Sequence, residues 1–185
     1  MGDIFSSIET YGYIILFLYS FGGGMVALIA AGVLSYAGKL DLTTSLAVAF
    51  LANTLGDMLL FYMGRYNKEQ IMPYVHKHKR KLALSHILMK KHGWVIVFLQ
   101  KYIYGVKTLI PIAIGLTKYN QNKFFILNIA AAFLWTLVIG LTSFYSGEAV
   151  MKLVDIISEK PYIAPMILFG FAGSIWFYLK YATKK

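Results

Sequence analysis

Five apolar blocks, separated by short polar segments, constrain this chain more than any other feature. They cover residues 11–38, 44–64, 93–116, 124–147 and 162–181, and hydrophobic residues make up 58% of the 185. A helix needs about 20 apolar residues to cross the hydrocarbon core of a bilayer. The sequence therefore predicts an all-α membrane protein that forms a single membrane domain over residues 1–185. Because the chain has no cysteine, a disulfide framework and a thiolate metal site are excluded.

Two of the blocks are interrupted, whereas the other three are continuous. Three successive glycines at 22–24 break the block 11–38, and Gly105 and Pro111 break the block 93–116. Each glycine weakens a helix by about 1 kcal/mol relative to alanine. We therefore expect both blocks to fold back as re-entrant broken-helix hairpins, while the remaining blocks cross as transmembrane helices.

The broken blocks belong to an internal repeat. Residues 11–29 align with 92–110 at an offset of 81, which brings seven identical residues into register. Beyond a two-residue insertion, the run Ala-Phe-Leu at 49–51 matches the same run at 132–134, and each half ends in an FYxG motif. The predicted organisation is repeat 1 at 11–65, an amphipathic connector at 66–91, repeat 2 at 92–148 and a C-terminal transmembrane helix at 162–182.

Charge counting predicts the orientation. If each hairpin returns to the face that it entered, residues 1–10, 39–43 and 148–161 share one side, with three basic and six acidic residues. Residues 65–92, 117–123 and the C-terminal tail share the other side, with thirteen basic residues and one acidic residue. Basic loops stay in the cytoplasm. We therefore expect a cytoplasmic C-terminus and two repeats inserted in opposite directions.

Two lysines flank the second break, at a depth where charge is costly and marks function. On one continuous helix Lys101 and Lys107 would point about 240° apart, but a break between them lets both face one site. Inverted repeats with broken helices bind their substrates near the midplane, and the positive end of a broken helix suits an anion. The predicted substrate-binding residues are Lys101, Lys107, Tyr104, Gly105, Gly23 and Gly24.

Asp57 is the carboxylate that we expect at membrane depth, about 12 Å along its helix from Arg65. It is placed to pair with Lys101 or Lys107 when the site is empty and to take a proton during a cycle. Asn53, one turn earlier, is predicted to share its hydrogen bonds. Three simpler interpretations stay open: the lysines reach the headgroups, the carboxylate is a static partner, or the glycine run serves close helix packing.

The connector 66–91 is rich in basic residues with apolar residues at helical spacing. This pattern predicts a helix on the inner leaflet, where each basic residue near anionic lipid contributes about 1 kcal/mol. We expect residues 65–91 to contact anionic lipids and the chain not to bind nucleic acid. The histidines at 76, 78 and 86 lack carboxylate or cysteine partners, so no metal site is predicted.

Several of these residues resemble the DedA family of bacterial inner-membrane proteins, part of the superfamily that includes VTT-domain and SNARE-associated Golgi proteins. KYIYGVK at 101–107 is similar to the family's Arg-Phe-x-Pro-Gly-x-Arg element, and Gly-Asp at 56–57 and FYMGR at 61–65 are similar to its first-repeat helix. Gly115, Asn128 and Trp135 follow the element as in the family. Both arginines of that element are lysines here, and the first hairpin tip has no acidic residue.

The resemblance, which covers about residues 10–147, implies a transporter or flippase for a lipid-linked anion in the bacterial inner membrane. Undecaprenyl phosphate or a related phospholipid is the implied substrate, with H⁺ or Na⁺ as the coupling ion and no other cofactor. Arg65, Gly115 and Trp135 are expected to be structural. A coupled transporter of a small solute is the alternative, and a homodimer is one option for assembly. A lipid-phosphate enzyme is less favoured, because the membrane blocks lack a histidine to activate a nucleophile.

Overall fold

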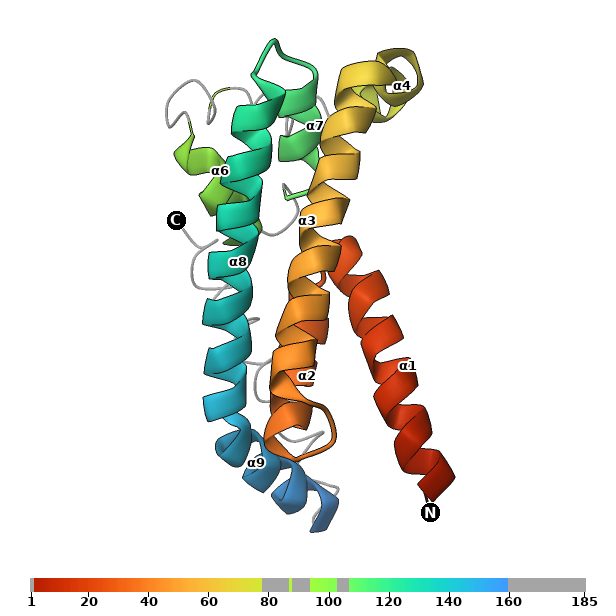
Figure 1. Cartoon of the computed structure of the whole chain (residues 1–185), viewed down its shortest axis with the longest axis vertical. Coiled ribbons are helices and arrows are strands. Elements are labelled where there is room, and N and C mark those ends of the chain that lie inside the picture. The colour runs from red at the N-terminus through yellow and green to blue at the C-terminus, as the bar shows by residue number, and fades with distance from the viewer. Residues whose placement is uncertain (1, 78–86, 88–93, 103–106, 160–185) are drawn as a thin grey trace, which may run out of the picture.

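The computed structural model describes residues 2–77, 87, 94–102 and 107–159 (Figure 1). Four predictions lie outside these residues. They concern Tyr104, Gly105, the C-terminal helix 162–182 and the connector beyond residue 77, which carries two of the three histidines. They stay predictions.

Every regular element in the described part of the chain is a helix, which confirms the predicted all-α class. The elements are α1 (Gly2–Phe21), α2 (Met25–Tyr36), α3 (Leu42–Tyr66), α4 (Lys68–Lys77), α6 (Val95–Leu99), the 3₁₀ turn η1 (Gln100–Tyr102), α7 (Leu109–Gly115), α8 (Gln121–Tyr145) and α9 (Gly147–Glu159).

Helices α3 and α8 run the full height of the molecule in opposite directions (Figure 1). By length and composition, they are the two described helices that are long and apolar enough to cross a membrane. Both start at a polar cap: an Asp41 oxygen accepts from the Thr44 N–H at 2.7 Å, and an Asn120 oxygen accepts from the Lys123 N–H at 3.0 Å. Such caps satisfy backbone donors that a helix start leaves free. The Thr44 hydrogen bonds also lower the pKa of Asp41.

Helices α1 and α2 form a hairpin that opens at one end of the molecule and turns near mid-height (Figure 1). The turn occurs at the predicted glycines 22–24. Gly23 has φ of +85°, a backbone conformation that residues other than glycine rarely adopt. The Gly24 N–H donates to the Tyr19 carbonyl at 2.7 Å. The segments α6 and α7 enter from the opposite end (Figure 1).

The shorter helices α2 and α7 pack against the two long helices. Helix α2 packs against α8 and α7 packs against α3, and glycines allow both contacts. A Cβ built on Gly32 would lie 2.7 Å from the Ser143 Cβ. A Cβ built on Gly115 would collide with the Phe61 carbonyl oxygen. Backbone therefore meets backbone at both crossings.

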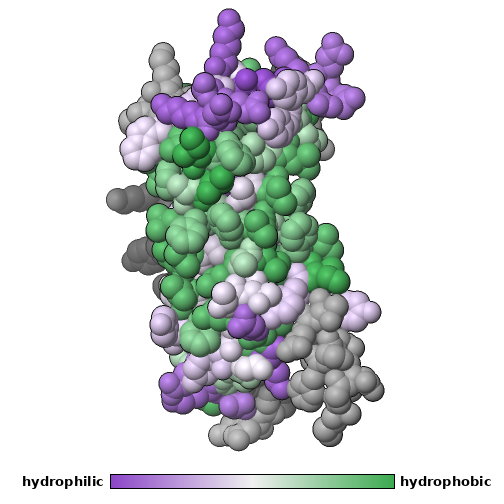
Figure 2. Space-filling view, viewed as in Figure 1, coloured by the Kyte–Doolittle hydropathy of each residue, from purple (hydrophilic) through white to green (hydrophobic). Residues whose placement is uncertain are grey.

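An apolar belt covers the middle of the molecule between two polar ends (Figure 2). Its exposed side chains include Leu51, Leu55 and Leu59 of α3 and Phe133 and Leu134 of α8. One end carries the start of α4 and the α7–α8 turn, and the other carries the α2–α3 turn and α9 (Figure 1). The loop segments that the charge count grouped together thus lie at the same end wherever they are described.

Helix α9 is not among the predicted helices, because the charges of residues 148–161 predict a polar segment at one membrane surface. Its charged residues Glu148, Lys152 and Asp155 recur every three or four positions, which is helical spacing. Lys152 pairs with Glu148 at 2.6 Å. The helix starts under α2, where a Cβ on Gly147 would collide with Tyr36.

The α7–α3 crossing generates a stability prediction. Gly115→Ala should lower the free energy of unfolding by about 1–3 kcal/mol, because the new Cβ meets backbone that cannot swing away. Gly12→Ala is the matched control, since its Cβ would meet only the end of the Leu40 side chain at 3.2 Å. Thermal unfolding of both variants in detergent measures the difference, and equal midpoints would contradict the packing account.

Candidate functional site

The ammonium group of Lys101 is held by three side-chain oxygens in the interior. Its Nζ donates to the Asn53 Oδ1 at 2.5 Å, to the Asp57 Oδ2 at 2.6 Å and to the Asn128 Oδ1 at 3.2 Å. The side chain of Lys101 is 0% exposed and that of Asp57 is 6% exposed. An ammonium has three N–H donors, so these oxygens, which we name the Lys101 cage, use all of them.

Two long helices and one short turn bring the Lys101 cage together. Asn53 and Asp57 lie one turn apart on α3, and Asn128 faces them from α8. The Asn128 Nδ2 donates to the Thr54 carbonyl at 3.1 Å, which leaves its oxygen directed at the ammonium. Lys101 enters from η1.

The pairing of Asp57 answers one open question from the sequence. Of the two lysines offered as partners, Asp57 contacts Lys101, and Asn53 shares the hydrogen bonds. Sequence reasoning named Asn128 only as a family motif position and did not place it in the site. The sequence does contain a sign of this role, because an asparagine inside an apolar helix needs a hydrogen-bond partner in the interior.

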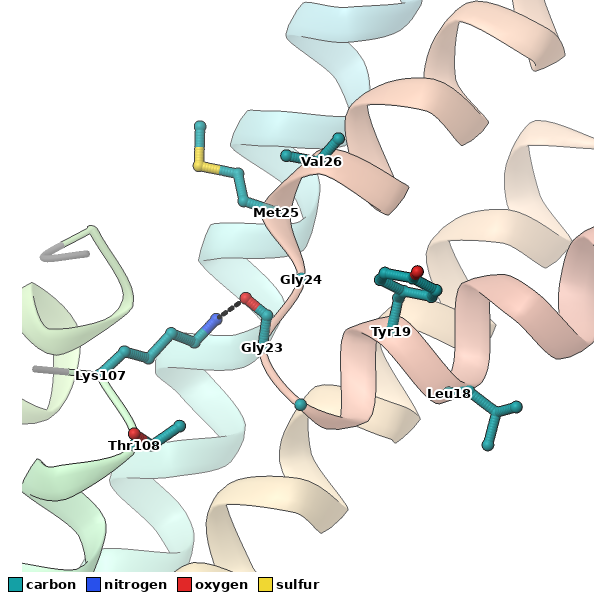
Figure 3. A pocket seen from close by; sticks show the side chains of 9 residues that line it. Leu18, Tyr19, Gly23, Gly24, Met25, Val26, Lys107 and Thr108 are labelled. Carbon is teal, nitrogen blue, oxygen red and sulfur yellow. Dashed lines mark hydrogen bonds between the residues drawn. The ribbon is translucent and has the colours of Figure 1, made fainter. Parts of the chain in front are cut away.

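Lys107 lies in a different environment and reaches across to the turn of the α1–α2 hairpin (Figure 3). Its Nζ donates to the Gly23 carbonyl at 3.0 Å and lies 4.4 Å from the centre of the Trp135 ring. Within the described residues Lys107 has no carboxylate at ion-pair distance. Trp135, predicted as structural, thus also supports a cation through its ring face.

A hollow of about 590 Å³ opens beside this contact, and we name it the tip pocket. Residues 22–26, Leu18, Tyr19, Lys107 and Thr108 line it. Its rim is apolar and exposed, since Leu18, Tyr19 and Val26 are 64%, 65% and 73% exposed. Helix α2 begins at the pocket wall, and its N-cap residue, Gly24, provides no capping side chain. The pocket therefore combines an ammonium group, the positive end of a helix and an apolar border.

The glycines of the turn have local roles in the backbone, and their part in substrate binding stays a prediction. A Cβ on Gly23 would lie 2.6 Å from the Lys107 Cε, and a Cβ on Gly24 would lie 2.7 Å from the Tyr19 carbonyl oxygen. The run therefore makes the turn and admits Lys107, while packing against α3 falls to Gly56, whose Cβ would collide with the Phe21 carbonyl.

Arg65 and Gly115 lie near the end of the molecule that carries the start of α4 and the α7–α8 turn, away from the tip pocket. We name this end the basic end. The Arg65 Nε donates to the Gly115 carbonyl at 2.9 Å, and its Nη2 donates to the Tyr119 carbonyl at 2.6 Å. The guanidinium also lies 5.0 Å from the centre of the Phe61 ring. These contacts tie the end of α3 to the turn between α7 and α8.

Among the residues that the structure describes, some buried polar atoms near the site have no hydrogen-bond partner. They include both amide atoms of Gln100, the Asn53 Nδ2 and the Trp135 Nε1. Gln100 is fully buried next to Lys101, and sequence reasoning missed it. Unpaired groups of this kind are costly in a protein interior, so the region around the lysines is polar but not fully satisfied.

A family model for the VTT domain matches residues 22–144, which include both lysines, Asp57 and Trp135. The chain belongs to the VTT-domain family. The resemblance to the DedA family is confirmed, and with it the prediction of a membrane protein.

Curated relatives of this VTT-domain protein cover most of its length. It is 26% identical to the inner membrane protein YohD of Escherichia coli over 148 residues, which are 80% of this chain and 77% of YohD. It is 27% identical to the Escherichia coli inner membrane protein YqjA over 180 residues, or 88% and 80% of the two chains. It is 23% identical to undecaprenyl phosphate transporter A of Staphylococcus aureus over 171 residues, or 86% and 82%. No solved structure matches the chain.

The buried ion pair generates a second prediction. Lys101→Met should lower the free energy of unfolding by about 3–5 kcal/mol, because it leaves the Asp57 charge buried without a partner. The double variant Lys101→Met/Asp57→Asn should regain most of this loss, since it buries no charge. Denaturant unfolding in mixed micelles measures both, and a double variant no more stable than the single one would contradict the account.

Proposed function

We propose that this protein is a transporter or flippase for a lipid-linked anion, with undecaprenyl phosphate or a related phospholipid as the substrate. The observation that carries the proposal is the tip pocket, where the Lys107 ammonium and the α2 N-terminus meet an exposed apolar rim. An anionic headgroup in hydrocarbon needs a cation and hydrogen-bond donors. The lipid chain needs neither and can lie along Leu18 and Val26 at the exposed rim of the pocket.

A membrane topology of two re-entrant hairpins in inverted repeats fits this function. In its support, the α1–α2 hairpin turns at mid-height, and the segment that carries Lys107 comes from the opposite end (Figure 1). Gly32 and Gly115 are 83 positions apart, which is the offset that aligns 49–51 with 132–134, and at both glycines a Cβ would meet the backbone of a long helix. Phe50 and Phe133, another aligned pair, contact each other with ring centres 6.0 Å apart, as residues near a pseudo-twofold axis would.

The proposed location is the bacterial inner membrane, in a multi-pass topology with the basic end and the C-terminus in the cytoplasm. Five basic residues and one acidic residue lie in the described part of that end: Arg65, Lys68, Lys77, Lys118, Lys123 and Glu69. Such a surface attracts anionic lipids of the inner leaflet. The names of YohD and YqjA support the location. A homodimer stays a prediction.

The substrate class also draws on a relative. The Staphylococcus aureus protein is named an undecaprenyl phosphate transporter, and we extend that class to this chain because the pocket suits it. A coupled transporter of a small solute is the alternative, and it would not need the exposed apolar rim. We propose that the protein is not an enzyme, since the described pocket lining offers no carboxylate or imidazole as a general base.

Coupling is proposed to run through the Lys101 cage. A proton on Asp57 would cancel the charge that holds the Lys101 ammonium, and the ammonium would then be free to move toward an arriving anion. This step links headgroup binding to proton uptake, while Na⁺ is the other coupling ion that we consider.

Lys107→Ala tests the headgroup site. Loss of one charge-assisted hydrogen bond is worth about 1.5–3 kcal/mol, so transport of labelled undecaprenyl phosphate in proteoliposomes should fall about 10- to 100-fold. Lys118→Ala, at the basic end, is the matched control and should transport normally. If the wild type moves small anions but no lipid phosphate, the small-solute function replaces the proposal.

Asp57→Asn tests the coupling. The amide keeps an oxygen for Lys101 but cannot take up and release a proton, so the pH dependence of transport should disappear. Asp41→Asn is the control, because it changes an exposed carboxylate and keeps a capping side chain. A pH profile in Asp57→Asn that equals the wild-type profile would remove the carboxylate from the mechanism.

A further inference from the structure

The Lys101 cage has the construction of a cation site. One carboxylate oxygen and two amide oxygens surround the nitrogen at 2.5–3.2 Å, which are hydrogen-bond distances to an ammonium. The oxygens come from α3 and α8, whereas the cation comes from the separate turn η1. The ligands and their occupant are therefore supplied by different parts of the chain.

The helices, and not the lysine, decide where the three residues that supply these oxygens lie. Asn53 and Asp57 are one turn apart on a continuous helix, so the helix alone puts them on one face. The Asn128 amide is oriented by its own hydrogen bond to the Thr54 carbonyl. Removing the lysine side chain would leave both helix positions and the Asn128 hydrogen bond in place, with the Asp57 carboxylate facing the volume that the side chain had filled.

We infer that the Lys101 cage is a preformed site for a monovalent ammonium-type cation, which the chain fills with its own tethered ammonium. A free primary alkylammonium should bind there once the lysine side chain is removed. Lys101→Ala deletes three methylene carbons and the nitrogen. The free cation n-propylammonium has the same four heavy atoms. This cation therefore fits both the oxygens and the vacated stem.

The inference has a consequence that rests on the proposed function. If the cage requires a cation, Lys101 can leave it during transport only when another positive charge takes its place. A proton on Asp57 is the smallest such replacement. The exchange of a tethered ammonium for a proton would thus be the coupling event itself.

The test measures thermal unfolding of the full-length Lys101→Ala variant in detergent against n-propylammonium chloride. A ligand that binds only the folded state raises the midpoint with the logarithm of its concentration. For a chain of this size we expect about 3–5 °C for each tenfold increase above the Kd. If the variant is purified unfolded, the same amine added during expression should restore a monodisperse folded fraction.

Three controls isolate the cage. Lys101→Met keeps the stem volume filled, so it should not respond to the amine. Lys101→Ala/Asp57→Asn removes the cage charge and should not respond either. Sodium chloride at the same concentration should have no effect on Lys101→Ala, because it leaves the stem volume empty.

The inference is overturned if Lys101→Ala shows neither a shift nor recovery of folding with the amine. It is also overturned if sodium chloride acts equally, or if the response survives Asp57→Asn. The midpoint does not depend on what the protein transports. A failure here is therefore separate from a failure of lipid transport by the wild type.

Discussion

The rest of the structure depends on one buried ammonium group, that of Lys101, which holds three separate elements together. It connects α3, α8 and η1 through three oxygens, and the residues involved lie up to 75 positions apart in the sequence, from Asn53 to Asn128. A buried charge is tolerated only when it is paired and hydrogen-bonded. The pair therefore restricts how the two long helices and the second broken segment can be placed relative to one another.

Glycines also fix how the helices are placed, because they allow backbones to approach closely. At Gly32, Gly56 and Gly115 a Cβ would meet a neighbouring helix at less than contact distance, so these helices approach more closely than side chains would allow. Close approach brings the α1–α2 turn within reach of Lys107, although the two are 84 positions apart in the sequence. The tip pocket exists because this turn, which has no side chains of its own at 22–24, leaves space beside the lysine.

The sequence predicted those features that local chemistry decides. The length of α3 and α8, the turn at 22–24 and the location of the described loops at two ends follow from apolar length, glycine and charge. Helix α9 was not predicted, because its charges indicate a surface segment and only their spacing of three or four positions indicates a helix. Asn128, Gln100 and the contact of Lys107 with Trp135 depend on which faces of distant helices meet, and no local pattern reports that.

The two lysines have different partners, and a lysine is suited to each position for a different reason. Lys101 meets three oxygens on two helices, an arrangement that a compact ammonium with three donors can satisfy. The planar fork of an arginine is made for two parallel acceptors. Lys107 passes so close to Gly23 that a single added carbon on that glycine would touch its stem, and its ammonium needs only the Gly23 carbonyl and the Trp135 ring as partners. The same residue type therefore gives one cation that is fully bound and another that remains available at the pocket. An anion entering at the turn would meet Lys107 first, and only displacement from the oxygens would bring Lys101 to it.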